Sequence, residues 1–340
     1  MTDTVNGIYD LKHLSSCLSQ NSSIKTSTNG ESMSNIQISL VIPTFDRADL
    51  ITFTIESALN QTKRFLDIIV VDDGSTDNTE NILIKFHTNI KYIRTKNIGV
   101  QNARNVGAAA ASGTYITFCD SDDLLEENFV EIIENFLNGR SNCNAVYTNF
   151  TTFRGEETFG TKFSSAPKNF FNGQMYDKNF IISMPDLYIK TIQFQPFFVT
   201  GLTIEKSAFF NIGGFNTLMH KVPSEDWEFT LRVLAKCSVG ICLMPLARIR
   251  KHGSNESRDP NRQTSGEARI LEFALKNHDE ARKWENVLIE SINNRRVDAF
   301  NGYFSRKMYI EAYKVASLIN IRPKNVKFYV KYIISKALSK

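Results

Sequence analysis

The residues of this sequence most suited to chemistry are aspartates. Asp120 and Asp122 follow the apolar run 115–119, and further aspartates occur in PTFDR at 43–47 and DDGS at 72–75. Neighbouring carboxylates repel each other unless a cation lies among them, and paired hard oxygen ligands suit Mg²⁺ or Mn²⁺. Such an ion would neutralise a diphosphate and make it a better leaving group. The pair Asp120 and Asp122 is therefore predicted to bind a divalent metal ion.

These aspartates also have a purely structural interpretation. Asp122 or Asp123 would stabilise, by about 1 kcal/mol, a helix that begins near Leu125. Asp72 would orient the turn at 74–75 through its side chain. Helix capping accounts for one carboxylate but not for carboxylates in three separate segments, so the metal site stays the favoured hypothesis.

Four short apolar runs must position these residues. Between them lie segments whose apolar residues recur at spacings of three and four, which is typical of helices. Runs that are apolar throughout and alternate with helices predict an α/β fold with a parallel sheet covered on both faces. The carboxyl ends of parallel strands form one edge of a sheet, so the three polar segments should meet there. The runs are ISLVI at 38–42, LDIIVV at 66–71, IKYIR at 90–94 and YITFC at 115–119.

Composition excludes several classes of protein. The 340 residues are 42% hydrophobic and 22% charged, which is enough apolar material for a large core. A net charge of +4 does not indicate a nucleic-acid partner. Five cysteines without a CxxC pair, together with an N-terminus unlike a secretory signal, predict a reduced cytoplasmic protein. No run reaches the roughly 18 apolar residues of a spanning helix, so any membrane contact is expected to be peripheral.

Five motifs occur in one order along the chain and together resemble family 2 glycosyltransferases of the GT-A fold. They cover Ser39 to His252, about two thirds of the sequence. The resemblance implies a Rossmann-like sheet, a nucleotide-diphosphate-sugar donor such as a UDP-sugar, Mn²⁺ or Mg²⁺, and inversion at the anomeric carbon. The motifs are LVIPTFDR at 40–47, IIVVDDGSTDNT at 68–79, NIGVQNARNVG at 97–107, YITFCDSDDLL at 115–125 and SEDWEFTLRVL at 224–234.

The resemblance also implies roles for individual residues. Asp73 matches the carboxylate that accepts a hydrogen bond from uracil N3, and Arg104 matches a residue facing the base or diphosphate, although it could be a surface residue of an Ala-rich helix. Gly107 would let that helix approach the sheet. The residues implied at the nucleotide are Pro43, Thr44, Arg47, Asp73, Arg104, Asp120 and Ser121. The implied metal ligands are Asp120, Asp122 and His252, although a histidine in a basic loop is commonly only solvated.

Asp226 matches the catalytic base of the family, which removes the proton from the acceptor hydroxyl. Since it begins an apolar-periodic segment, it could also serve as a helix cap. Glu225 is the competing carboxylate, interpreted as a helper that orients the acceptor or the loop. The pair Gly213 and Gly214 resembles an acceptor-side turn, and turn geometry alone would also explain it.

The sequence is predicted to have three parts: a flexible arm at 1–35, a GT-A domain at 36–260 and a C-terminal helical region at 261–340. The last twenty residues contain six basic and no acidic residues. Their apolar residues fall on one side of a helical wheel and their lysines toward another. This pattern predicts either a helix on the inner face of an anionic membrane or a terminal helix packed on the domain with solvated lysines.

These observations predict a metal-assisted inverting glycosyltransferase, whose acceptor is a glycan or a lipid-linked glycan. The alternative is a non-catalytic module that binds nucleotide sugars or glycans. A nucleotidyltransferase would need an Arg- and Lys-rich loop after the first strand, where only Arg47 stands, and a dehydrogenase would need a GxGxxG motif there.

Overall fold

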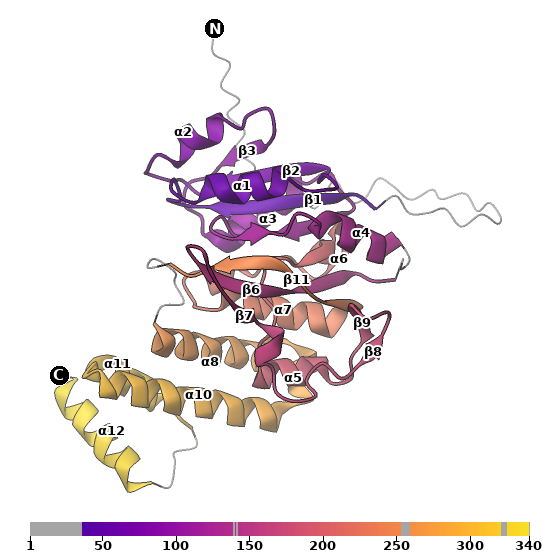
Figure 1. Ribbon diagram of the computed structural model, residues 1–340. Coiled ribbons are helices and arrows are strands. Elements are labelled where there is room, and N and C mark those ends of the chain that lie inside the picture. Colours follow the sequence, from indigo (N-terminus) through magenta and orange to yellow (C-terminus); the bar gives the residue numbers. More distant parts are fainter. Residues whose placement is uncertain (1–35, 139, 141, 253–258, 321–324, 340) are drawn as a thin grey trace. The chain divides into compact units, whose positions relative to one another are not determined.

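The computed structural model (Figure 1) describes residues 36–138, 140, 142–252, 259–320 and 325–339. The predicted arm at 1–35, Cys17 and residues 321–324 of the basic tail lie outside the described residues. Residues 35–340 belong to one compact unit. The domain boundaries proposed at 35/36 and 260/261 remain predictions.

The first four strands form the parallel part of the sheet, as the apolar runs predict. Their order is β3-β2-β1-β4, and each neighbouring pair is parallel. Every residue of β1 and β4 is buried, whereas β3 lies at the edge and is more exposed. The bounds are β1 (Ile38–Thr44), β2 (Asp67–Asp72), β3 (Lys91–Arg94) and β4 (Tyr115–Phe118).

The rest of the sheet is mixed, which the sequence did not reveal. β10 (Thr203–Glu205) lies between β4 and β6 and is antiparallel to both, whereas β6 and β11 are parallel. β10 has only three residues, so no periodicity marked it as a strand that joins two halves of a sheet. The other strands are β5 (Leu124–Leu125), β6 (Ala145–Arg154), β7 (Glu157–Thr161), β8 (Gln174–Met175), β9 (Phe180–Ser183) and β11 (Val239–Arg250).

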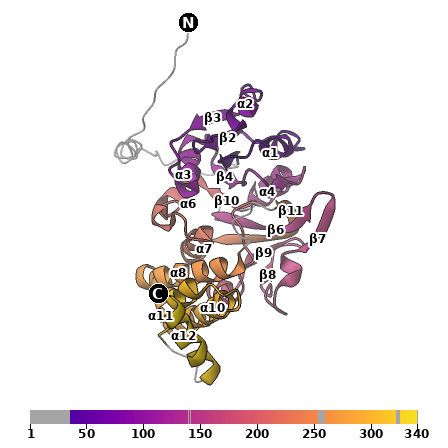
Figure 2. The same ribbon diagram turned by 90° about the vertical axis from the view of Figure 1, so that its left-hand side faces the viewer.

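Helices cover both faces of the sheet, which confirms the predicted α/β class. Leu40 and Ile42 of β1 pack in the cluster that includes α1 and α4, and Val41 packs in the opposite cluster with α3, α6 and α7. Figure 2 shows these two groups of helices on either side of the strands. The bounds are α1 (Ile51–Leu59), α2 (Thr79–Ile84), α3 (Val100–Ala110), α4 (Phe129–Asn138), α6 (Lys206–Asn211) and α7 (Glu225–Lys236).

Gly107 brings α3 close to the sheet. A Cβ atom at this position would lie 2.3 Å from Cγ1 of Val41 and 3.2 Å from Cγ2 of Val71. Such separations are far below van der Waals contact, so only glycine fits while α3 keeps this depth. The close approach expected of Gly107 is confirmed.

The C-terminal residues are helical, as predicted. Asp259 caps α8 by accepting a hydrogen bond from the amide of Asn261 (3.0 Å), and Pro260 occupies the first turn. Trp227 and Leu231 of α7 pack in one apolar cluster with α5, α8 and α10, and a second cluster joins α10, α11 and α12. The remaining bounds are α5 (Leu187–Gln193), α8 (Pro260–Asn277), α9 (Asp279–Arg282), α10 (Glu285–Ser305), α11 (Tyr309–Ser317) and α12 (Val326–Leu338), with 3₁₀ turns η2 (Phe163–Ser165) and η3 (Thr217–Met219).

None of the helices in the described part of the chain combines the length and the apolar character needed to cross a lipid bilayer.

Candidate active site

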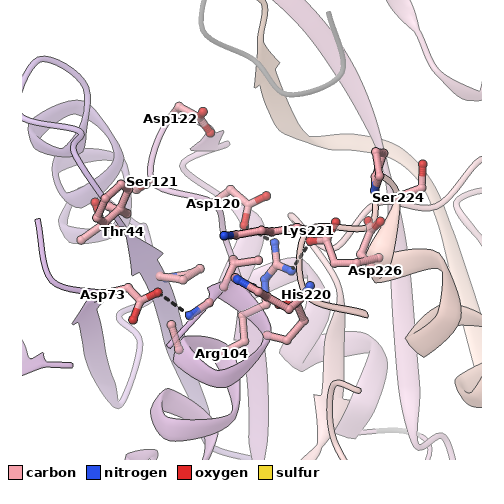
Figure 3. Close-up of a pocket in the computed structure, with 18 of the residues that line it drawn as sticks. Thr44, Asp73, Arg104, Asp120, Ser121, Asp122, His220, Lys221, Ser224 and Asp226 are labelled. Atoms are coloured by element: carbon pink, nitrogen blue, oxygen red, sulfur yellow. Dashed lines mark hydrogen bonds and ion pairs between the residues drawn. The ribbon is translucent and has the colours of Figure 1, made fainter. Parts of the chain in front are cut away.

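A pocket of about 690 Å³ opens beyond the carboxyl ends of β1, β2 and β4. Its opposite side is formed by the segment that precedes α7 and by the first turn of that helix (Figure 3). The volume is that of a site for a small molecule. The residues predicted for nucleotide, metal or catalysis that line it are Pro43, Thr44, Arg47, Asp73, Arg104, Asp120, Ser121, Asp122 and Asp226. His252 does not line the pocket but contacts Asp122.

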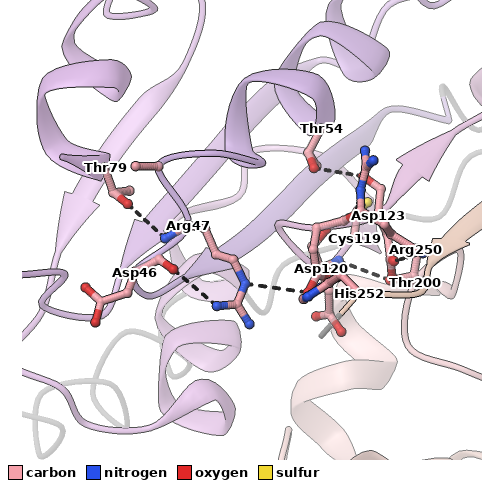
Figure 4. Close-up of polar contacts among 12 residues, drawn as sticks. Asp46, Arg47, Thr54, Thr79, Cys119, Asp120, Asp123, Thr200, Arg250 and His252 are labelled. Carbon is pink, nitrogen blue, oxygen red and sulfur yellow. Dashed lines mark hydrogen bonds and ion pairs between the residues drawn. The ribbon is translucent and has the colours of Figure 1, made fainter. Parts of the chain in front are cut away.

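The loops after β1 and β2 are held together by hydrogen bonds. The amide of Asp46 donates to Oγ of Ser75 (2.9 Å), and the amide of Arg47 donates to Oγ1 of Thr79 (2.9 Å; Figure 4). Asp46 has a positive φ of 50°, and its carboxylate accepts from the amide of Thr76 (2.7 Å). Asp46 therefore shapes the turn that presents Arg47.

Asp72 and Asp73 have different structural roles. The carboxylate of Asp72 accepts from the amide of Ser75 (2.8 Å), so the turn-orienting role considered for it is confirmed. The carboxylate of Asp73 accepts from the amides of Ile98 and Gly99, each at 2.7 Å. Asp73 thus anchors the start of α3, where Gly99 has a φ of 93°. Its bond to uracil remains a prediction.

Arg104 lies at the centre of the site and is only 3% exposed. Its Nη2 donates to Oδ1 of Asp120 (2.7 Å), and its Nη1 donates to Oε1 of Glu225 (3.2 Å). Burial lowers the pKa of Arg104, but the attraction of Asp120 and Glu225 outweighs it and leaves the pKa raised. Arg104 is therefore a charged link between the loop after β4 and the start of α7, not a surface residue of α3.

Asp226 is a partly buried carboxylate in the first turn of α7. Burial, and next the charge of Glu225, raise its pKa to about 7, although Arg104 acts in the opposite direction. Ser224 is the residue that precedes the helix, so Asp226 is not its cap. A carboxyl group that titrates near neutral pH suits proton transfer.

Asp122 faces a guanidinium and an imidazole. Its Oδ2 lies 2.9 Å from Nε2 of His252 and 3.5 Å from Nε of Arg47. Asp123 points away into the core, where it accepts from Oγ1 of Thr200 (2.7 Å) and from the amide of Arg250 (2.9 Å; Figure 4). Burial, and next the charge of Asp122, raise the pKa of Asp123.

The prediction of a helix that begins near Leu125 is wrong. Residues 124–125 form β5, which pairs with Ala247 and Arg248 of β11, and α4 begins only at Phe129. Helix capping therefore does not explain Asp122 or Asp123. Pairing with a strand more than 120 residues away gave no local signal in the sequence.

The metal site remains a prediction, and two of its predicted ligands lie together. Within the described ranges, no three His, Cys, Asp or Glu side chains are grouped as a metal site. Asp122 and His252 nevertheless bring a carboxylate oxygen and an imidazole nitrogen within 2.9 Å of each other. Both are ligands that Mn²⁺ accepts, and diphosphate oxygens would supply further ligands.

Sequence reasoning did not place the segment 219–223 at the site, and it gave Ser224 no role beyond membership of the motif at 224–234. His220, Lys221 and Ser224 line the pocket, and Figure 3 shows the first two between the Asp73 side and the Asp226 side. Lys221 and Ser224 adopt left-handed backbone conformations with φ of 60° and 63°. Oγ of Ser224 accepts from Nε2 of Gln263 on α8 (2.6 Å). One feature of the sequence could have identified these residues: they directly precede Glu225 and Asp226.

Asn105 and Gly214 shape the neighbouring turn. Gly213 and Gly214 have φ of 91° and 60°, so turn geometry accounts for both glycines. The side chain of Asn105 brackets this turn, because Oδ1 accepts from the amide of Phe215 (2.8 Å) and Nδ2 donates to its carbonyl (2.9 Å).

Comparisons with known proteins give one consistent result. The model of the family described as glycosyl transferase family 2 matches residues 39–221, just over half of the chain. An uncharacterized glycosyltransferase of Rickettsia felis is 28% identical over 243 residues, which cover 70% of this chain and 37% of that protein. The minor teichoic acid biosynthesis protein GgaB of Bacillus subtilis is 37% identical over 141 residues, covering 38% of this chain and 16% of that protein.

A solved structure shares the fold. The crystal structure of S. aureus TarS 1–349 in complex with UDP-GlcNAc has a TM-score of 0.59 with this chain at 18% identity, covering 88% of this chain and 89% of that one. Together with the mixed sheet and its flanking helices, this likeness identifies the predicted GT-A fold. The matched part of the chain spans little more than a third of the length of the Rickettsia relatives.

Proposed function

This chain belongs to glycosyl transferase family 2, and from that premise we propose that it is an inverting glycosyltransferase that moves a sugar from a UDP-sugar to a hydroxyl group of a glycan or lipid-linked glycan. The observation that carries the proposal is the pocket that Asp120, Asp122 and Asp226 line together. Arg104 joins its two sides through hydrogen bonds to Asp120 and to Glu225, the neighbour of Asp226. The UDP-GlcNAc complex of TarS supports a uridine donor, because the two chains share one fold.

The donor nucleotide is proposed to lie over the ends of β1, β2 and β4. Thr44 and Asp73 are buried there at the strand ends, and the loop that follows Pro43 offers backbone groups to a base edge. Arg47 reaches from the same loop toward Asp122. A guanidinium in this place would attract the diphosphate.

Mn²⁺ or Mg²⁺ is proposed to be held by Asp120, Asp122 and His252. Bound there, the ion would accept charge from the departing diphosphate. Oδ2 of Asp122 already lies 3.5 Å from the guanidinium of Arg47 and 2.9 Å from the imidazole of His252. Arg47 and the imidazole thereby keep Asp122 oriented toward the rim of the pocket.

Asp226 is proposed to be the catalytic base. It would take the proton from the acceptor hydroxyl while the acceptor oxygen forms its bond to the anomeric carbon and the bond to the diphosphate breaks, so UDP leaves with the bonding electron pair. Attack from the side opposite the diphosphate inverts the configuration. The pKa of about 7 leaves a substantial fraction of Asp226 ionised at neutral pH and able to accept a proton.

Arg104 is proposed to be a positioning residue. It contacts Asp120 on one side and Glu225, the neighbour of the base, on the other. Because it is buried and doubly paired, it fixes the distance between the donor loop and the first turn of α7. The glycan or lipid-linked acceptor and a cytoplasmic location belong to the same proposal.

Isothermal titration calorimetry with UDP, GDP and TDP, each with Mn²⁺ and with a chelator, tests the donor site. We expect UDP to bind most tightly and to lose affinity in the chelator. Incubation with UDP-GlcNAc and other UDP-sugars then tests turnover through release of UDP. Binding without turnover on any donor and acceptor would favour the non-catalytic module, and no nucleotide binding would contradict the proposal.

A further inference from the structure

The last helix of the described chain turns apolar side chains outward. Val326, Val330, Ile333 and Ala337 recur along α12 at spacings of four, three and four, so they lie on one face of the helix. All four are exposed, with Val326 at 79% and Ile333 at 64%. Six of the eighteen large apolar residues that are exposed in the described chain lie on this one helix of 13 residues. We call Val326, Tyr329, Val330, Ile333, Ile334 and Ala337 the outer face of α12.

The opposite side of α12 holds the helix in place. The Phe328 ring is buried and packs against Phe300 of α10, with 5.1 Å between ring centroids. Tyr332 packs against Tyr313 of α11 at 5.7 Å, and Nζ of Lys331 donates to the side chain of Asn301 (2.7 Å). Asn325 caps the helix by accepting from the amide of Lys327 (2.8 Å). The helix therefore already has its intramolecular contacts, and the residues of the outer face remain exposed. Figure 1 shows α12 at the C-terminal end of the molecule.

The charged residues of α12 are all lysines. The sequence has no aspartate or glutamate after Glu311, but seven lysines and arginines follow it. Lys327 and Lys336 flank the outer face and are exposed. In the described part of the chain, neither is paired with a carboxylate. An apolar strip between lysines combines the two features that bind anionic lipid surfaces, namely apolar insertion and attraction to headgroups.

We propose that the outer face of α12 binds the surface of an anionic membrane. The apolar side chains would enter the boundary between headgroups and acyl chains, while Lys327 and Lys336 contact lipid phosphates. A second copy of the chain fits this face less well, because a two-fold contact would bring basic residues against basic residues without a counter-charge. The inference goes beyond sugar transfer and does not depend on it.

Vesicle sedimentation of the whole chain tests this inference without any nucleotide sugar. We expect binding to vesicles of phosphatidylcholine with phosphatidylglycerol to exceed binding to phosphatidylcholine alone by about tenfold, and to weaken at high salt. The double variant Val330→Asp with Ile333→Asp should lower binding to the mixed vesicles by about tenfold or more, since it removes apolar insertion and adds negative charge. Lys327→Gln with Lys336→Gln should lower it by roughly tenfold through the loss of charge alone.

Ile84→Asp is the matched control, because Ile84 is 56% exposed on α2 and belongs to a different surface. This variant should bind the mixed vesicles as the parent does, and circular dichroism should show that all variants keep the parent's helical content. Equal binding by the parent and the Val330→Asp/Ile333→Asp variant would overturn the inference. A second result would also overturn it: the parent binds neither vesicle type and sediments as a dimer, whereas the Val330→Asp/Ile333→Asp variant is a monomer. The outer face would then be covered by a second copy of the chain.

Discussion

Two pairs of carboxylates face each other across the pocket, and their surroundings differ. Asp122, on the loop after β4, is within 3.5 Å of Arg47 and His252. Asp226, in the first turn of α7, has Glu225 as its neighbour, and Arg104 acts on both of them and on Asp120. Burial and the charge of Glu225 make Asp226 hold its proton more tightly.

The contrast teaches that residue type alone does not assign a role in this site. A carboxylate among cations is suited to holding charge, and one whose pKa is raised to about 7 is suited to exchanging a proton. The distinction arises from elements far apart in the sequence, because Arg104 and Glu225 are 121 residues apart. Substitutions on either side should therefore fail in different ways.

Asp226→Asn should have the largest effect. It keeps the shape of the side chain but cannot accept the proton, so we expect transfer to fall by about a thousandfold while UDP affinity stays near that of the parent. Transfer rates and calorimetry measure the two quantities separately. Glu225→Gln is the comparison, and a larger loss of transfer in that variant would move the base to Glu225.

Asp122→Ala should remove the metal dependence of nucleotide binding. We expect UDP to bind this variant equally well with Mn²⁺ and with the chelator. Transfer should fall by about a hundredfold, because removing a group in or next to a metal site typically lowers activity by that order. Asp279→Ala, which removes a carboxylate that is 93% exposed on α9, is the control and should change neither quantity. Metal-dependent UDP binding that survives in Asp122→Ala would refute the ligand assignment.

The dependence of the transfer rate on pH tests the proposed role of Asp226. A base must be ionised to act, so with a pKa of about 7 transfer should fall as the pH is lowered through 7, to about a tenth of its maximum at pH 6. Arg104→Gln removes the cation that lowers this pKa, so the fall should begin at a higher pH. The variant should also lose about 3 kcal/mol of unfolding free energy, because it leaves carboxylates unpaired.

Arg104→Lys serves as the control for that experiment, since it retains the positive charge. Its pH profile should lie closer to that of the parent than the profile of Arg104→Gln does. A profile that is identical in all three proteins would show that Arg104 does not act on the base.

Gly107→Ala should have the smallest effect on transfer. Its Cβ would meet Cγ1 of Val41 at 2.3 Å, so α3, which carries Arg104, must move away from the sheet. We expect unfolding in denaturant to show a loss of about 2 kcal/mol. Ala108→Gly, one residue along the same helix, is the comparison for helix propensity. Unchanged stability in Gly107→Ala would mean that α3 shifts without cost.

Local patterns were sufficient to predict part of this molecule. The buried strands β1, β2 and β4 are mostly apolar, and the polar motifs directly after them meet at one edge of the sheet. The positions of Asp120, Asp122 and Asp226 around one pocket follow from those motifs and from the family resemblance. Their proposed roles await the experiments above.

Long-range contacts determine what local patterns missed. β5 replaces the expected helix because it pairs with β11, and β10 has no pattern of its own. The loop at 219–224 enters the pocket because α8 and α3 hold it, through Gln263 and Gln101. On α12 the helical wheel separates the apolar residues from the lysines. The packing of Phe328 against α10, together with the exposure of the apolar side, shows that this side faces outward.

The arrangement of β10 has a consequence for the order in which the chain can fold during synthesis. β4 receives its second neighbour only when residues 203–205 have left the ribosome, and β6 receives its parallel neighbour only with residues 239–250. Until then each strand presents an open edge, which is a template for aggregation. Nascent chains paused before residue 203 should therefore need chaperone protection, and truncations before residue 250 should be poorly soluble even though they retain the four parallel strands.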